Sequence, residues 1–202
     1  MSENRYTIID LLRHGDVQGG RCYRGVKDDP LSDLGWQQML NATDNQTWDA
    51  IVSSPLQRCS AFAEHLSADF ETVQNFKEIN FGDWEGQTAE AIHQHSAEHL
   101  THFMCDPAHN PPPNGEILTA FQNRIINEWN RLFTKHQFRH ILLISHGGTM
   151  RTIISHILNM STQDMMRLEI EHASMSRIRI YHENNESFPS LVFHGRPNER
   201  LS

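Results

Sequence analysis

The sequence predicts an α/β fold in which a mostly parallel central sheet is flanked by helices. Short apolar runs rich in β-branched residues alternate with segments of helical periodicity. Two of these runs, at 6–12 and 140–145, end in the same dipeptide, His-Gly. Residues 174–181 alternate arginine with isoleucine, which indicates a half-exposed strand, and 191–194 would return as its partner.

The first half of the chain gives clear boundaries. We expect a buried strand at 6–12, followed by a helix over 33–40 with Ser32 as its N-cap. A second short strand follows at 50–53. A helix then starts at Ser53-Ser54-Pro55, since proline suits the first helical position.

The second half is predicted to begin with two helices, at 88–105 and 116–134, joined by a rigid proline-rich loop. The strand at 140–145 precedes a helix that carries Met150, Ile153, Ile154, Ile157 and Leu158 on one face. We therefore expect a single domain over 1–202, with a helical insertion at about 78–135 lying over the active site.

The composition narrows the possible partners. Lys+Arg 17 against Asp+Glu 25 gives a formal net charge of −8, which disfavours nucleic acid and anionic membranes. No apolar run approaches the roughly 20 residues of a membrane span, and the polar start lacks a secretory h-region, so we expect a cytoplasmic protein. The three cysteines form no Cys-x-x-Cys motif, which disfavours a disulfide framework or a thiolate zinc site. The chain also contains 14 histidines, an unusually large number.

The two His-Gly dipeptides predict a common site. Ligands bind outside the carboxyl ends of strands in open α/β sheets, so His14 and His146 would meet there if their strands are parallel neighbours. Arg13 adjoins the first histidine, and Arg58 lies in the opening turns of a helix that follows a third strand. That helix start also offers free N–H groups. Imidazoles, guanidiniums and amides together favour phosphate binding.

Other phosphate chemistries lack their residues. The chain contains neither a Gly-x-x-x-x-Gly-Lys-Ser/Thr loop nor a Gly-x-Gly-x-x-Gly turn. A thiol phosphatase needs arginine six positions after its cysteine, but Cys22, Cys59 and Cys105 are followed there by Asp28, His65 and Pro111. Histidine is the nucleophile that remains.

The motifs in their order resemble the histidine phosphatase superfamily, in its phosphoglycerate mutase-like branch. They are Leu11–Gly15, Tyr23–Gly25, Asp28–Ser32, Ser53–Arg58, Glu78–Gly86, Asn114–Glu116 and Ile144–Gly148. Within the superfamily, the segment 81–85 and the chain length are most similar to the α-ribazole-5′-phosphate phosphatases.

The resemblance implies a phosphomonoesterase that works through phosphohistidine. His14 would be the nucleophile. Glu78 would protonate the leaving group and then activate water, with Glu85 as its rival in the same segment. The charge on the phosphoryl oxygens would be offset by Arg13, Arg58, His146 and Gly147.

The resemblance further implies no metal or other cofactor and a small-molecule phosphate ester as substrate, with α-ribazole 5′-phosphate of cobalamin biosynthesis as the first choice. A phosphoglycerate mutase or a broad-specificity sugar phosphatase of the same fold is the alternative. A catalytically silent phosphate-ester sensor is a third possibility, which the intact set of site residues argues against.

The loop after Gly15 departs from the family pattern. The asparagine that often faces the phosphate there has no counterpart in this chain. Instead the loop is basic, and Arg21, Tyr23 and Arg24 are candidate substrate-binding residues. They either contact a second anionic group of the substrate or remain solvated.

A metal-dependent alternative comes from another segment. His95-Ser-Ala-Glu-His99 matches the His-x-x-Glu-His pattern of zinc hydrolases, and His93 and His102 lie nearby. We instead expect these histidines to border an apolar stripe of the same helix, made of Ile92, Ser96, Leu100, Phe103 and Met104.

Overall fold

The computed structural model describes residues 6–184 and 186–196 and confirms the α/β class. Within these residues the strands form a six-stranded sheet in the order β3-β2-β4-β1-β5-β6. Strands β1 to β4 run parallel, while β5 and β6 are antiparallel to their neighbours, as the alternating segment predicted. The strands are β1 Tyr6–Arg13, β2 Ala50–Ser53, β3 Glu71–Thr72, β4 His140–Ser145, β5 Met175–Glu183 and β6 Glu186–Arg196.

The helices agree with the expected segments to within a few residues. They are α1 Asp33–Thr43, α2 Gln57–Leu66, α3 Ala89–Cys105, α4 Leu118–Lys135 and α5 Gly147–Ile157, with short 3₁₀ turns η1 Gln74–Phe76, η2 Gly82–Trp84 and η3 Asp164–Arg167. Ser32 caps α1 as predicted, because its Oγ accepts a hydrogen bond from the Gly35 N–H at 3.0 Å. The prediction that α2 starts at Pro55 is wrong: α2 begins two residues later, and Ser54 Oγ instead contacts His146.

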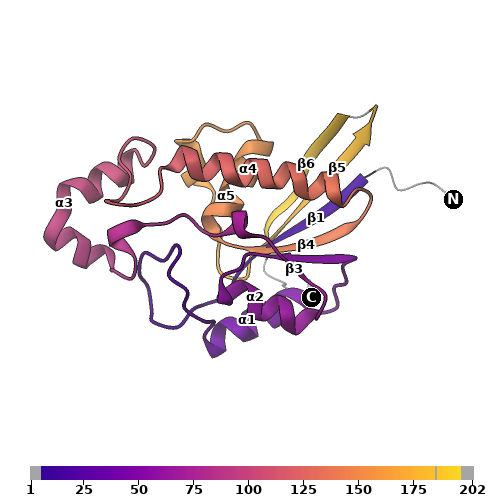
Figure 1. Ribbon diagram of the computed structural model, residues 1–202, viewed down its shortest axis with the longest axis horizontal. Helices are drawn as coiled ribbons and strands as arrows, with labels where there is room; N and C mark the ends of the chain where they lie inside the picture. The colour runs from indigo at the N-terminus through magenta and orange to yellow at the C-terminus, as the bar shows by residue number, and fades with distance from the viewer. Residues whose placement is uncertain (1–5, 185, 197–202) are drawn as a thin grey trace.

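Two apolar layers cover the sheet (Figure 1). On one face, α4 and α5 pack against the strands in the larger core. On the other face, α1 and α2 bury Met39, Cys59 and Phe62 against the sheet. The sheet is thus shielded on both sides, which leaves the ends of its parallel strands as the place for a site.

The expected insertion at 78–135 divides into two parts. Helix α4 buries Phe121, Ile125 and Trp129 in the larger core, so it belongs to the layer that covers the sheet. Only the segment before it, with α3, stands away from the sheet (Figure 1). This segment has its own small cluster around Trp84, and Met104, which we expected to be buried there, is 64 % exposed.

A buried carboxylate ties three strands together at the middle of β1. Asp10 is fully buried and accepts hydrogen bonds from Trp48, from His140 of β4 and from Arg177 of β5. Burial alone would raise the pKa of Asp10, but these donors outweigh it and hold the pKa below its ordinary value. The ionised form is therefore part of the folded structure.

Replacing Asp10 should destabilise the fold in a pH-dependent way. Asp10→Ala leaves the guanidinium of Arg177 and the ring N–H groups of Trp48 and His140 without their acceptor, and we expect a loss of about 3 kcal/mol in the free energy of unfolding at pH 7. Because the folded pKa is lowered, this contribution is present above the unfolded pKa of about 3.9 and disappears as the pH falls through the folded value. Urea unfolding at pH 7 and pH 3 measures both effects, with exposed Asp69→Asn as the control. Equal stability of Asp10→Ala and wild type at pH 7 would contradict this account.

Candidate active site

The two His-Gly dipeptides meet as the sequence predicted. Strands β1 and β4 are parallel neighbours, with Arg13 opposite Ser145, so the residue that follows each strand lies at the same edge of the sheet. The rings of His14 and His146 are 5.3 Å apart between centroids, and both side chains are buried. This carboxyl edge is the centre of the candidate site.

The backbone fixes the tautomer of His14. Its Nδ1 lies 2.8 Å from the Gly15 carbonyl oxygen, which can only accept, so Nδ1 carries the proton. The lone pair of the neutral ring is therefore on Nε2. Burial, together with the charges of Arg58 and Arg13, lowers the pKa of His14 well below 6.5. The ring is thus neutral at neutral pH, with Nε2 unprotonated.

The ring of His146 is held in the opposite tautomer. Its Nδ1 accepts from Arg58 Nε at 3.3 Å, because a guanidinium can only donate, so the proton lies on Nε2. Nε2 then donates to Ser54 Oγ at 2.7 Å. Both nitrogens are occupied in this arrangement, and contact of His146 with a phosphoryl oxygen stays a prediction.

Arg58 is fully buried and holds the loop that follows His14. Its two terminal nitrogens donate to the carbonyls of Gly25 and Lys27 at 2.6 and 2.7 Å. The start of α2 is also engaged, since the Gln57 N–H donates to Asp28 at 2.7 Å. The expectation that this helix start offers free N–H groups is therefore wrong for Gln57, whose N–H is taken by the side chain of Asp28.

A second guanidinium borders the first turn of α5. Arg13 donates one nitrogen to the Ile170 carbonyl at 2.6 Å, while its buried Nε has no partner among the described residues. A Cβ built on Gly147 would lie 3.6 Å from that Nε and 3.4 Å from Arg151. Burial lowers the pKa of Arg13 to about 10, so it stays charged at neutral pH. An unpaired cationic donor beside a helix N-terminus suits an oxyanion.

Glu78 lies against the same helix start. Its Oε2 accepts from the Gly148 N–H at 2.8 Å and its Oε1 from the Ile79 N–H at 2.9 Å. The segment around it is held by Arg124 of α4, which donates to the carbonyls of Lys77 and Glu78 and pairs with Glu116. Glu78 is 7 % exposed, so its carboxylate is largely shielded from water.

The rival carboxylate, Glu85, is occupied by backbone amides. It accepts from the N–H groups of Gly25, Val26 and Lys27 at 3.0–3.1 Å, and from the Phe81 N–H at 2.8 Å. Glu85 therefore fastens the loop after His14 to the 78–86 segment. This arrangement favours Glu78 over Glu85 as the residue that moves protons.

The basic loop residues fall into different surroundings. Arg24 pairs with Asp29 at 2.8 Å and donates to two loop carbonyls, and Lys27 pairs with the same aspartate. Arg21 is exposed. The ring of Tyr23 packs against Phe81, Trp84 and Phe103. A direct substrate contact for Arg21, Tyr23 and Arg24 stays a prediction, in which the tyrosine has the most suitable surface.

The His-x-x-Glu-His pattern is interrupted by a kink. Ser96 has non-helical backbone angles, φ −155° and ψ 48°, so His95 and His99 do not lie on one continuous helix. His99 Nε2 donates a hydrogen bond to the Pro111 carbonyl, and the His99 ring packs on Trp84. Across residues 6–184 and 186–196, no group of three His, Cys, Asp or Glu side chains is arranged to hold a metal ion.

Three residues near the site were not singled out from the sequence. Arg124 and Arg151 come from helices whose apolar faces alone were apparent, and His172 lies in a loop without a motif. His172 has its ring 5.5 Å from that of His14. In a single sequence these positions carry no signal, because the contacts that place them are made between distant segments.

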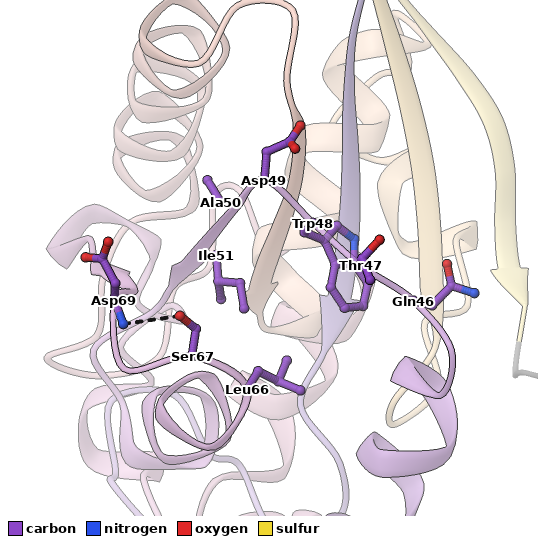
Figure 2. Close-up of a pocket in the computed structure, with 9 residues that line it drawn as sticks. All are labelled: Gln46, Thr47, Trp48, Asp49, Ala50, Ile51, Leu66, Ser67 and Asp69. Atoms are coloured by element: carbon purple, nitrogen blue, oxygen red, sulfur yellow. Dashed lines mark hydrogen bonds between the residues drawn. The ribbon is translucent and has the colours of Figure 1, made fainter.

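A pocket at the other end of the sheet lies apart from these residues (Figure 2). It is lined by residues 46–51 together with Leu66, Ser67 and Asp69. Ala50 is the first residue of β2, whereas the histidines follow the last residues of their strands. The pocket is thus at the amino ends of the strands and contributes nothing to the site.

The carboxyl edge of the sheet therefore gathers a neutral histidine, the guanidiniums of Arg13 and Arg58 and a carboxylate, a set of groups that suits the binding of a phosphate ester. The family model of the histidine phosphatase superfamily, branch 1, matches residues 9–188. The chain belongs to this superfamily and is a phosphatase.

Known proteins resemble it over nearly its whole length. The chain is 29 % identical over 190 residues to the adenosylcobalamin/alpha-ribazole phosphatase of Escherichia coli strain K12, covering 90 % of this chain and 92 % of that protein. The crystal structure of the alpha-ribazole phosphatase from Shigella flexneri is similar with a TM-score of 0.81 at 26 % identity, over 94 % and 96 % of the two chains. Bacillus stearothermophilus YhfR shares the fold, with a TM-score of 0.83 at 22 % identity and coverage of 96 % and 100 %. In the part of the chain that the structure describes, none of the helices could cross a membrane.

The contact between Gly148 and Glu78 can be tested by adding one methyl group. A Cβ on Gly148 would overlap the Glu78 carboxylate, so Gly148→Ala should displace it. We expect kcat to fall about 100-fold, within the range for loss of general acid–base catalysis. The melting temperature should not fall, because alanine is the better helix former. When Gly148→Ala is added to Glu78→Gln, kcat should fall little further, because both changes act on the same contact. If the two changes instead reduce kcat by independent factors that multiply in the double variant, the contact is contradicted.

Proposed function

We propose that the protein hydrolyses a small-molecule phosphate monoester through a phosphohistidine on His14, with α-ribazole 5′-phosphate as its substrate. The observation that carries the proposal is the state of His14: a buried neutral ring whose Nδ1–H is held by the Gly15 carbonyl, which leaves Nε2 as the base. The reaction would proceed in two steps at this ring.

In the first step, Nε2 of His14 attacks phosphorus and the P–O bond to the substrate alcohol breaks. The phosphoryl oxygens would be bound by the unpaired Nε of Arg13 and by the first turn of α5 at Gly147. Arg58 would contribute its charge from the position that it holds beside His146. The leaving alkoxide takes a proton from the carboxyl of Glu78.

In the second step, Glu78 acts as carboxylate. It takes a proton from a water molecule, which attacks the phosphorus and breaks the N–P bond. Inorganic phosphate leaves, and His14 returns to its neutral state.

The substrate is proposed from two observations. The similar proteins from E. coli and Shigella flexneri are named for α-ribazole phosphate. The loop after His14 also carries Tyr23, a half-exposed ring at the border of an aromatic cluster. An aromatic surface beside a phosphate site suits the planar base of a nucleotide-like ester, which can pack on it edge to face or stacked.

A ranking of phosphate esters by kcat/KM tests this function. We expect α-ribazole 5′-phosphate to rank above sugar phosphates, phosphoserine and 3-phosphoglycerate, with release of inorganic phosphate. His14→Ala should lose all measurable turnover, while exposed His93→Ala should retain it. Preference for a glycolytic phosphate with transfer to a second substrate would identify a mutase instead. Undiminished activity of His14→Ala would contradict the mechanism.

A further inference from the structure

A third imidazole lies beside His14. The rings of His172 and His14 are 5.5 Å apart between centroids, with their planes tilted by 42°. His172 is half-buried and lies in the turn between η3 and β5. His172 is far from His14 in the sequence. The antiparallel pairing of β5 with β1 places the start of β5, just after His172, beside the end of β1.

The backbone around His172 is firmly placed. Ser174 N–H donates to the Glu171 carbonyl at 3.2 Å, which closes a turn around His172 and Ala173. Ala173 has φ +54°, a left-handed conformation that alanine rarely adopts. Its N–H donates to the His14 carbonyl at 3.2 Å. Strained backbone of this kind persists where the surrounding structure enforces it, often at functional sites.

His146 and Arg58, which also lie beside His14, already have partners, whereas the buried Nε of Arg13 has none among the described residues. Both ring nitrogens of His146 are bonded, and Arg58 uses all three of its donor nitrogens. In the loop after Gly15, the Gln18 amide nitrogen donates to Leu31. By contrast, no hydrogen bond to the ring of His172 is made by any residue within 6–184 or 186–196. Its N–H is therefore available to a ligand.

The charges that face His172 keep it neutral. Burial is the largest influence, and it lowers the pKa to about 4 with the help of the cations Arg13 of β1 and Arg24 of the loop. The carboxylate of Asp16 acts in the opposite direction. A neutral imidazole carries one N–H donor and one acceptor, so it can bind an oxyanion without adding a charge that repels Arg13.

We propose that His172 is a catalytic residue which donates its ring N–H to a non-bridging phosphoryl oxygen during transfer to His14. This inference rests on the proposed function, because it needs a phosphoryl group at His14. The donor strengthens as charge develops on the oxygen, so it acts mainly in the transition state.

The test compares His172→Ala and His172→Asn with the wild-type protein, using p-nitrophenyl phosphate as substrate and orthovanadate as probe of the transition-state geometry. We expect His172→Ala to lose about 100-fold in kcat/KM and to bind vanadate correspondingly more weakly, as for removal of one oxyanion donor. His172→Asn keeps an N–H and should recover part of both. The exposed His156→Ala is the matched control and should behave as wild type.

Each outcome decides between the proposals. Wild-type vanadate affinity and turnover in His172→Ala would overturn the role of His172 and leave the proposed function intact. Equal losses in His172→Ala and His172→Asn, with lowered melting temperatures, would make the role structural and overturn it as well. A wild-type protein that neither binds vanadate nor hydrolyses any phosphate monoester would overturn the proposed function itself.

Discussion

The site depends on one fully buried cation, the guanidinium of Arg58. Burying an isolated charge is strongly unfavourable, so each of the three guanidinium nitrogens needs an acceptor. Two carbonyls of the loop after His14 and one ring nitrogen of His146 accept them. The same charge disfavours protonation of both histidines, which are themselves buried. Arg58 thus shapes the loop, fixes the His146 tautomer and helps to keep His14 neutral.

Two carboxylates connect this centre to the segment that carries Glu78. Glu85 accepts hydrogen bonds from backbone amides of the loop after His14. Glu116 pairs with Arg124 and accepts a hydrogen bond from the Asn80 N–H. Glu78 is placed between these two anchors and against the start of α5. Three carboxylates near one motif thus have separate tasks. Glu85 and Glu116 hold the backbone of the 78–86 segment, and Glu78 contacts the first turn of α5, where the proposed mechanism gives it the proton transfers.

Local patterns were enough to predict the helices, every strand except the two-residue β3, and the meeting of His14 with His146. That prediction succeeded because buried strands have a strong signal and parallel strands end at a common edge. Local patterns could not predict which segments far apart in the sequence pack against each other. The stripe of α4 showed an apolar face but not that the sheet would cover it, and the His95/His99 pattern did not reveal the kink at Ser96. Spacing likewise could not separate Glu78 from Glu85, which backbone amides distinguish.

The central claim is that a neutral Nε2 of His14 accepts the phosphoryl group, and the most direct measurement is to trap that intermediate. The protein would be mixed rapidly with phosphate-labelled ester, quenched during turnover, digested and mapped by mass spectrometry. The account predicts an acid-labile phosphoryl group on the peptide that contains His14, formed at least as fast as steady-state turnover. Active protein that carries no label, or that carries it on another residue, would contradict the account.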